Sequence, residues 1–210
     1  MILILGVHGI NTSPTDDYGA RWQQALALRN VRAAVVEARW RSTGTIGGDI
    51  AKVMFNWSFR DEQIHILKER LWDFWAESRR QCHKSIVVAH SMGQPLILAA
   101  ERELRIEGRP TMLEYVTIGG PLSHPIWGSG LGVVGLGRPT AQTPIAFWNK
   151  DDGVSALKSG WVQPPSWMDN RRIAIPGEIG FVVEHDATLY LSNPNVSRAI
   201  EEHAYECRYE

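Results

Sequence analysis

Continuous apolar runs alternate along this chain with segments in which apolar positions recur every three or four residues. The continuous runs are typical of strands covered on both faces, as in a parallel sheet. They predict strands at 2–7, 31–38, 84–89, 113–120, 144–150 and 171–177. The clearest helical pattern lies at 61–81, where the three- and four-residue spacing places on one face Ile64, Leu67, Leu71, Phe74 and Trp75.

Three further segments predict helices, at 17–29, 92–105 and 193–206, the last capped by Asn193 or Asn195. Strands that alternate with helices favour an α/β fold, with a mostly parallel sheet of about six strands and helices on both faces. The 210 residues contain no internal repeat and no linker rich in Gly, Ser or Pro. We therefore expect a single domain over 1–210.

Two segments depart from this alternation. Residues 40–60 mix glycine pairs with aromatic residues and predict a loop and a short helix over the surface. Residues 121–143 are Gly-rich and apolar, and they are too long for an ordinary connection between strands. Two interpretations of 121–143 remain open: a lid or substrate wall, and a loop packed on the surface.

The composition argues against several classes of function. The chain has 22 Lys and Arg against 23 Asp and Glu, so the electrostatic argument for a nucleic-acid binder is missing. No window approaches the ~18 apolar residues of a membrane span. The first apolar run is short for a signal peptide and lacks a basic flank, which favours a cytoplasmic protein, although a mature protein without its leader has the same pattern. Cys82 and Cys207 are too few for a disulfide framework and do not resemble a metal site, so we expect two buried free thiols, with a pairing of the two as the alternative.

Ser91 stands where the strand SIVVA ends and a helical pattern begins. It is either a nucleophile held on a sharp turn or an N-cap of the following helix. The stretch AHSMG matches the nucleophile elbow G-x-S-x-G, with Ala89 as a small residue in place of the first glycine. The position between strand and helix favours the nucleophile.

A serine hydroxyl needs a general base, and in the elbow arrangement the chain order is serine, acid, histidine. The stretch NKDDGVS after the fifth predicted strand supplies Asp151 and Asp152. We favour Asp152, since the glycine that follows lets the chain turn, and Asp151 remains the alternative. His185 lies between the last strand and the last helix, where the base is expected, whereas His203 lies among glutamates in the last helix.

Acyl transfer also needs backbone donors for the oxyanion. One candidate is the amide of Met92, directly after the serine. The other lies in the loop after the first strand, where the amide of Ile10 is favoured over that of Asn11 and Gly9 permits close approach. We expect His8 to order this loop by hydrogen bonds rather than to transfer protons.

Four stretches together resemble the α/β-hydrolase family, specifically its small lipase and esterase members. They are VHGI, AHSMG, DDGV and EHDATLY. The resemblance extends from residue 2 to about residue 203. It implies Ser91 as nucleophile, Asp152 as acid and His185 as base, with an oxyanion hole from the amides of Ile10 and Met92. The family usually carries extra antiparallel strands before the His-Gly loop, so a trimmed sheet is expected here.

These residues predict a serine hydrolase that cleaves small-molecule or lipid esters through an acyl-enzyme and needs no cofactor or metal. The apolar residues of 121–143 are candidates for an acyl-binding wall, chiefly Trp127, Leu131 and Val134. The same triad serves a thioesterase, an acyltransferase or a peptidase. A binding protein that kept a hydrolase fold is the alternative from another class.

Overall fold

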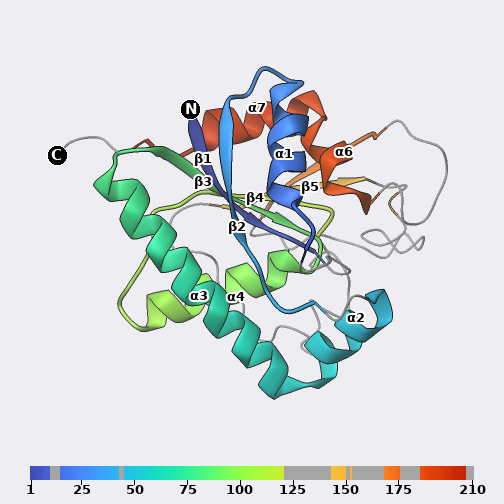
Figure 1. Ribbon diagram of the computed structural model, residues 1–210, viewed down its shortest axis with the longest axis vertical. Coiled ribbons are helices and arrows are strands. Elements are labelled where there is room, and N and C mark those ends of the chain that lie inside the picture. The colour runs from blue at the N-terminus through green and yellow to red at the C-terminus, as the bar shows by residue number, and fades with distance from the viewer. Residues whose placement is uncertain are drawn as a thin grey trace.

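A computed structural model describes residues 1–9, 15–42, 45–120, 143–149, 152, 168–175 and 185–206 (Figure 1). Its strands are β1 (Ile2–Val7), β2 (Ala33–Ala38), β3 (Lys84–His90), β4 (Tyr115–Ile118), β5 (Ile145–Asn149) and β6 (Asp169–Ile173). They form one sheet in the order β2-β1-β3-β4-β5-β6, and every neighbouring pair is parallel. The predicted α/β fold with a six-stranded, mostly parallel sheet is confirmed.

The described helices are α1 (Tyr18–Ala27), α2 (Ile46–Phe55), α3 (Trp57–Arg80), α4 (Gly93–Ile106), α6 (Ala187–Leu191) and α7 (Pro194–His203). The helix predicted at 61–81 begins four residues earlier, because the Asn56 side chain accepts a hydrogen bond from the Phe59 amide and caps it there. Asn193, rather than Asn195, caps α7. Cys82 is partly exposed rather than buried, and Cys207 lies outside the described residues.

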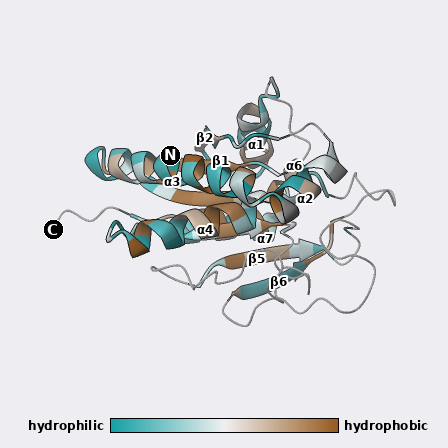
Figure 2. Ribbon diagram, turned by 90° about the horizontal axis from the view of Figure 1, so that it is seen from below, coloured by the Kyte–Doolittle hydropathy of each residue, from teal (hydrophilic) through white to brown (hydrophobic). Residues whose placement is uncertain are grey.

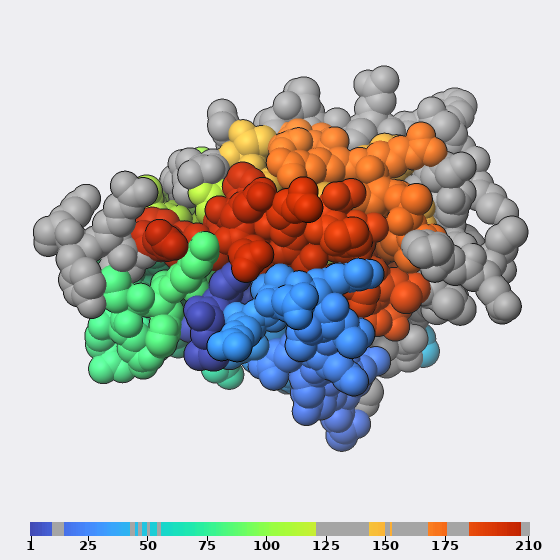
Figure 3. Space-filling model, turned by 90° about the horizontal axis from the view of Figure 1, so that it is seen from above, coloured from blue at the N-terminus to red at the C-terminus, as the bar shows by residue number. Residues whose placement is uncertain are grey.

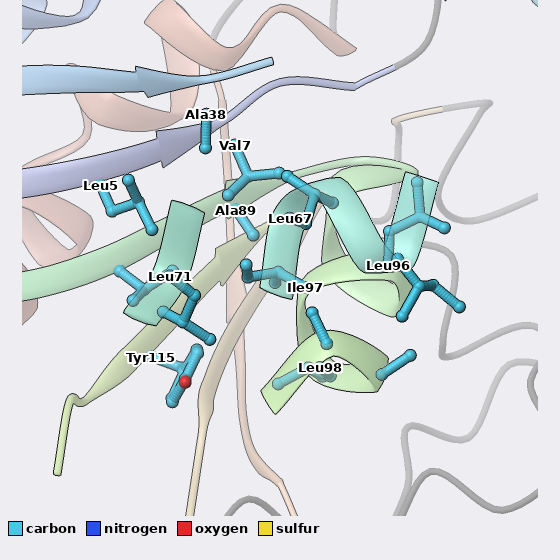
Figure 4. Packing of buried hydrophobic residues seen from close by; sticks show 14 of the residues in the cluster. Leu5, Val7, Ala38, Leu67, Leu71, Ala89, Leu96, Ile97, Leu98 and Tyr115 are labelled. Carbon is cyan, nitrogen blue, oxygen red and sulfur yellow. The ribbon is translucent and has the colours of Figure 1, made fainter. Parts of the chain in front are cut away.

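Alternate side chains of the buried strands pack on opposite faces of the sheet, and helices cover both. Leu5, Val7 and Ala89 belong to the core beneath α3 and α4, and Figure 4 shows them pointing toward these helices. Ile4 and Ile86, one residue out of phase, belong to a second core with α1, α6 and α7. Figure 3 shows α7 in red on that second face, between the blue N-terminal segments and the orange segment that contains β6.

The edge strand β6 differs from the inner strands in sequence and in bounds. It covers Asp169–Ile173, whereas the apolar pattern predicted 171–177. Its first four residues, DNRR, are not buried, and Figure 2 shows β6 as hydrophilic while β5 beside it is largely hydrophobic. An edge strand has only one neighbour, so its sequence lacks the continuous apolar run on which the prediction relied.

The strand order reverses direction at β1 and β3. After β1 the chain moves to β2 on one side, and after β2 it returns to β3 on the other side of β1. Ligands of open parallel sheets bind at such a reversal of strand order. His8 and Gly9 follow β1 at this point, and Ser91 follows β3. Among the described residues no helix is long and apolar enough to cross a membrane.

Candidate active site

Ser91 lies on a strained turn directly after the last residue of β3. Its φ of 51° falls in the left-handed region, which costs a non-glycine residue on the order of 1 kcal/mol. The Ser91 amide donates to the carbonyl oxygen of Ile118 at the end of β4, at 3.0 Å, which holds the turn against the sheet. The N-cap of α4 is Met92, without a side-chain cap. The alternative in which Ser91 caps the helix is therefore wrong.

Two glycines allow the chain to crowd around this turn. A Cβ on Gly93 would lie 2.5 Å from the carbonyl oxygen of His8, and a Cβ on Gly9 would lie 2.6 Å from the Cβ of Ser91. Both distances are shorter than real side chains tolerate. Ala89, which replaces the first glycine of the elbow pattern, is fully buried and pairs in register with Val7. Its methyl group fits in the core beneath α3 and α4.

The structure brings Ser91, His185 and Asp152 together from three separate segments. The Ser91 Oγ lies 2.7 Å from His185 Nε2, and His185 Nδ1 lies 2.8 Å from Asp152 Oδ2 and 3.1 Å from Oδ1. Exposed fractions are 3% for Ser91, 8% for His185 and zero for Asp152. The serine and histidine therefore keep a small opening, while the carboxylate is shielded from solvent.

This arrangement fixes the direction of each proton. The Asp152 carboxylate accepts from Nδ1–H of His185, which leaves Nε2 as an acceptor for the Ser91 hydroxyl proton. A neutral imidazole in this tautomer can remove the serine proton as an acyl bond is attacked. The resulting imidazolium would lie beside the buried carboxylate, which stabilises it.

Tyr190 also contacts the carboxylate, and sequence reasoning missed it. Its hydroxyl donates to Asp152 Oδ2 at 2.6 Å, and its side chain is fully buried. Gly119, at the end of β4 with φ of 56°, leaves room on the other side, since a Cβ there would lie 3.3 Å from both Asp152 Oδ2 and His185 Cε1. The stretch EHDATLY contains Tyr190, but the pattern gives no sign that its hydroxyl reaches the acid.

His90 is a second neighbour that sequence reasoning did not select. Its Nε2 donates to the backbone carbonyl oxygen of His185 at 2.7 Å, and the two ring centroids are 4.7 Å apart. Burial, with a smaller contribution from the nearby His185, lowers the pKa of His90 to about 3. His90 is therefore neutral at ordinary pH, with its proton on the nitrogen that faces the carbonyl.

The loop after β1 is ordered by His8. Its Nδ1 donates to the Gly9 carbonyl oxygen at 2.6 Å, its Nε2 accepts from the Trp40 amide at 3.3 Å, and its ring stacks on the Trp40 ring with centroids 5.2 Å apart. Burial is the main cause that lowers the pKa of His8, so the ring is neutral and suited to these contacts. The amide of Met92, at the start of α4, donates to no acceptor among the described residues.

Several predicted positions lie outside the described residues. They are Ile10, Asn11, Asp151, all of the segment 121–143 except its last residue, and within it Trp127, Leu131 and Val134. His203 is the last residue of α7. Among the described residues, the histidine that contacts Ser91 and Asp152 is His185 and not His203. Within the same part of the chain, no three His, Cys, Asp or Glu side chains gather as metal ligands would.

No protein-family model and no curated protein sequence matches this chain. Solved structures do match it, among them a dienelactone hydrolase from Anabaena variabilis, at 18% identity and a TM-score of 0.56 over 97% of this chain and 87% of that one. A Pyrobaculum calidifontis esterase matches at 12% identity and 0.52 over 96% and 77%, and esterase PE8 at 13% and 0.51 over 96% and 92%. The chain has the α/β-hydrolase fold.

In this α/β-hydrolase fold, β1 leads directly into the His8–Gly9 loop, and the six described strands are all parallel. That agrees with the trimmed sheet expected from the sequence. At 12–18% identity the likeness concerns the fold, and an α/β-hydrolase fold hosts many reactions, so the chemistry must be argued from the residues of the site.

Proposed function

We propose that this protein is a serine hydrolase that cleaves carboxylic esters through an acyl-enzyme. The single observation that supports the proposal most is the continuous contact from Ser91 Oγ to His185 Nε2, at 2.7 Å, and from His185 Nδ1 to Asp152 Oδ2, at 2.8 Å. Nucleophile, base and acid are within hydrogen-bond distance in the order that acyl transfer requires.

In the first half of the reaction, Ser91 Oγ attacks the carbonyl carbon of the ester while His185 Nε2 takes the hydroxyl proton. Negative charge develops on the carbonyl oxygen and is held by the amides of Met92 and Ile10. The bond to the leaving oxygen then breaks, and His185 donates its proton to the departing alcohol. The acyl group remains on Ser91.

The second half repeats these steps with water. His185 removes a proton from water, which attacks the acyl carbonyl, and the bond to Ser91 Oγ breaks as His185 returns the proton to the serine. Asp152 keeps the imidazole in one tautomer and stabilises its protonated form throughout. The cycle releases a carboxylic acid and needs no cofactor.

Esters are the substrate class that we favour because two matching structures with this fold are esterases by name. The apolar composition of 121–143, with Trp127, Leu131 and Val134, supports an acyl group of lipid or aromatic character. Comparing tributyrin with short p-nitrophenyl esters tests this choice. Turnover of acyl thioesters or peptides in preference to both would move the proposal to a thioesterase or a peptidase.

The central test is Ser91→Ala, with Ser58→Ala on the exposed side of α3 as a matched control. Ser91→Ala should abolish labelling by a fluorophosphonate probe and lower p-nitrophenyl ester hydrolysis by at least about a thousandfold. Ser58→Ala should be labelled and should hydrolyse the ester as the wild type does. Equal turnover by wild type and Ser91→Ala would show that Ser91 is not the nucleophile, and a wild type that is never labelled would favour a binding protein.

A further inference from the structure

The buried hydroxyl of Tyr190 is part of the hydrogen bonding around Asp152. Tyr190 lies on α6, and its oxygen is 2.6 Å from Asp152 Oδ2, the same carboxylate oxygen that His185 Nδ1 approaches at 2.8 Å. The Tyr190 side chain is fully buried, so water does not compete for this contact. A hydrogen bond to a charged, buried acceptor is stronger than one between neutral groups.

The direction of the Tyr190 hydroxyl proton follows from a second contact. The backbone amide of Asn149, at the end of β5, lies 3.3 Å from the Tyr190 oxygen and can act only as a donor to it. The hydroxyl therefore accepts from Asn149 and donates its own proton to Asp152. A backbone group fixed by the sheet thus determines where this proton points.

Helix α6 connects the tyrosine to the histidine. His185 comes directly before Asp186, the N-cap of α6, whose side chain accepts from the Thr188 amide at 2.8 Å. Tyr190 follows His185 by five residues and lies on α6, whereas His185 lies just before the N-cap. One short segment, 185–190, therefore carries the imidazole and the phenol that both contact Asp152 Oδ2.

We propose that Tyr190 is a positioning residue for the reaction, which holds the Asp152 carboxylate in the orientation that faces His185 Nδ1 and tempers its negative charge. The proposal rests on the serine hydrolase function above. Without the hydroxyl, Asp152 loses one of its donors and concentrates more charge on the oxygen beside His185. The protonated imidazole is then favoured, and the carboxylate is less firmly oriented.

The test is Tyr190→Phe, which removes only the hydroxyl. The matched control is Tyr115→Phe, since Tyr115 is also buried and its hydroxyl contacts Thr111 Oγ1 at 3.3 Å, in the core beneath α3 and α4. We expect Tyr190→Phe to lower kcat about tenfold with KM nearly unchanged, because the Asp152 carboxylate is then less firmly held in the orientation that faces His185 Nδ1. Tyr115→Phe should lower the melting temperature without changing kcat.

A second readout distinguishes positioning from a structural role. NMR follows the His185 ring through a pH titration, and Tyr190→Phe should raise the titration midpoint and shift the Nδ1–H resonance. His90 does not confuse this titration, because its pKa is about 3. Replacing Tyr190 by 3-fluorotyrosine, a stronger donor of the same shape, should move the midpoint in the opposite direction and serves if Tyr190→Phe folds poorly.

The titration does not depend on turnover, so it separates the two proposals. A wild type without esterase activity or probe labelling overturns the hydrolase function, while the NMR result still decides whether Tyr190 acts on His185 through Asp152. A midpoint and resonance that stay at the wild-type values in Tyr190→Phe overturn the positioning role. So does an equal shift of the midpoint by Tyr190→Phe in an Asp152→Asn background, where no carboxylate transmits the effect.

Discussion

The Nε2 of His90 lies 2.7 Å from the backbone carbonyl oxygen of His185. The residue before the proposed nucleophile thus holds the main chain of the proposed base. Because His90 ends β3 and Ser91 follows it directly, this contact ties both partners of the proton transfer to one strand end. The two histidines serve different purposes: His185 is expected to exchange protons, and His90 keeps its proton.

Replacing His90 by Phe tests this contact. The ring packing is kept and the hydrogen bond is lost, so we expect kcat to fall by about tenfold. Since the pKa of His90 is about 3, the loss should be the same at every pH from about 5 to 9, and the shape of the pH–rate profile should not change. His65→Ala on the exposed face of α3 is the control. A profile that changes shape would mean that His90 titrates in the working range.

Gly9→Ala should displace the nucleophile. The new methyl group would lie 2.6 Å from Ser91 Cβ and 2.9 Å from His90 Nδ1, so either the loop after β1 or the Ser91 turn must move. We expect the rate of ester hydrolysis to fall by about a hundredfold or more, because a displacement of about 1 Å is enough to misalign Ser91 with its reaction partners. The rate of fluorophosphonate labelling measures the effect on Ser91 directly.

Gly108→Ala is the matched control for Gly9→Ala. A Cβ there has open space, but φ is 73°, so the variant should lose about 1 kcal/mol of stability through backbone strain and keep its activity. Gly9→Ala that retains wild-type labelling would contradict the crowding around Ser91.

Asp152→Asn distinguishes the two aspartates that the sequence left open. An amide at this position no longer selects the tautomer of His185 that accepts the serine proton, so kcat should fall by about a thousandfold or more. Asp151→Asn should keep most of the activity if Asp152 is the acid. The reverse pattern would assign the role to Asp151. Comparing kcat of the two variants at one pH decides between them.

The buried carboxyl group of Glu114 should make the stability of the folded protein depend on pH. It is 9% exposed, and burial raises its pKa to about 7, whereas in the unfolded chain the carboxyl ionises near its ordinary value of 4.5. The folded state therefore keeps a proton that the unfolded state releases, and this contribution to stability is full below about pH 4.5 and is lost as pH rises toward 7.

Glu114→Gln stays neutral at all pH values and should escape this loss. At pH 8 we expect the variant to be more stable than the wild type by about 3 kcal/mol, and below pH 4.5 the difference should nearly vanish. Urea unfolding at pH 4.5 and pH 8 measures the difference. Glu202→Gln, on the exposed part of α7, should change stability equally at both pH values. A Glu114→Gln variant without any pH-dependent gain would contradict the raised pKa.

The inner strands could be predicted because burial on both faces leaves a continuous apolar run, as in β1 and β3. The same reasoning misplaced β6, where an edge strand begins with DNRR, and it did not separate α6, whose five residues are too few to show a helical period. The early start of α3 depends on the Asn56 cap, which lies in the segment 40–60, where the sequence predicted a loop and a short helix.

Ser91, Asp152 and His185 could be selected from the sequence because the elbow motif and the chain order of the triad are local or sequential signals. Tyr190 and His90 could not, because their roles depend on where α6 and the end of β3 lie in space. Tyr190 is five residues from His185 in the chain, but only the packing of α6 against β5 turns its hydroxyl to Asp152.

The all-parallel sheet also sets the distances within the site. β1, β3, β4 and β5 end at the same edge, and each is followed by a residue of the site or its surroundings: His8, Ser91, Gly119 and, three residues after β5, Asp152. A slip of β3 by one residue against Val7 or Ile118 would move Ser91 by about 3.3 Å and turn it to the other face. The hydrogen-bond register of the strands therefore determines the separation of the reacting groups. Core substitutions that loosen this register should reduce activity before they reduce the helical content of the fold.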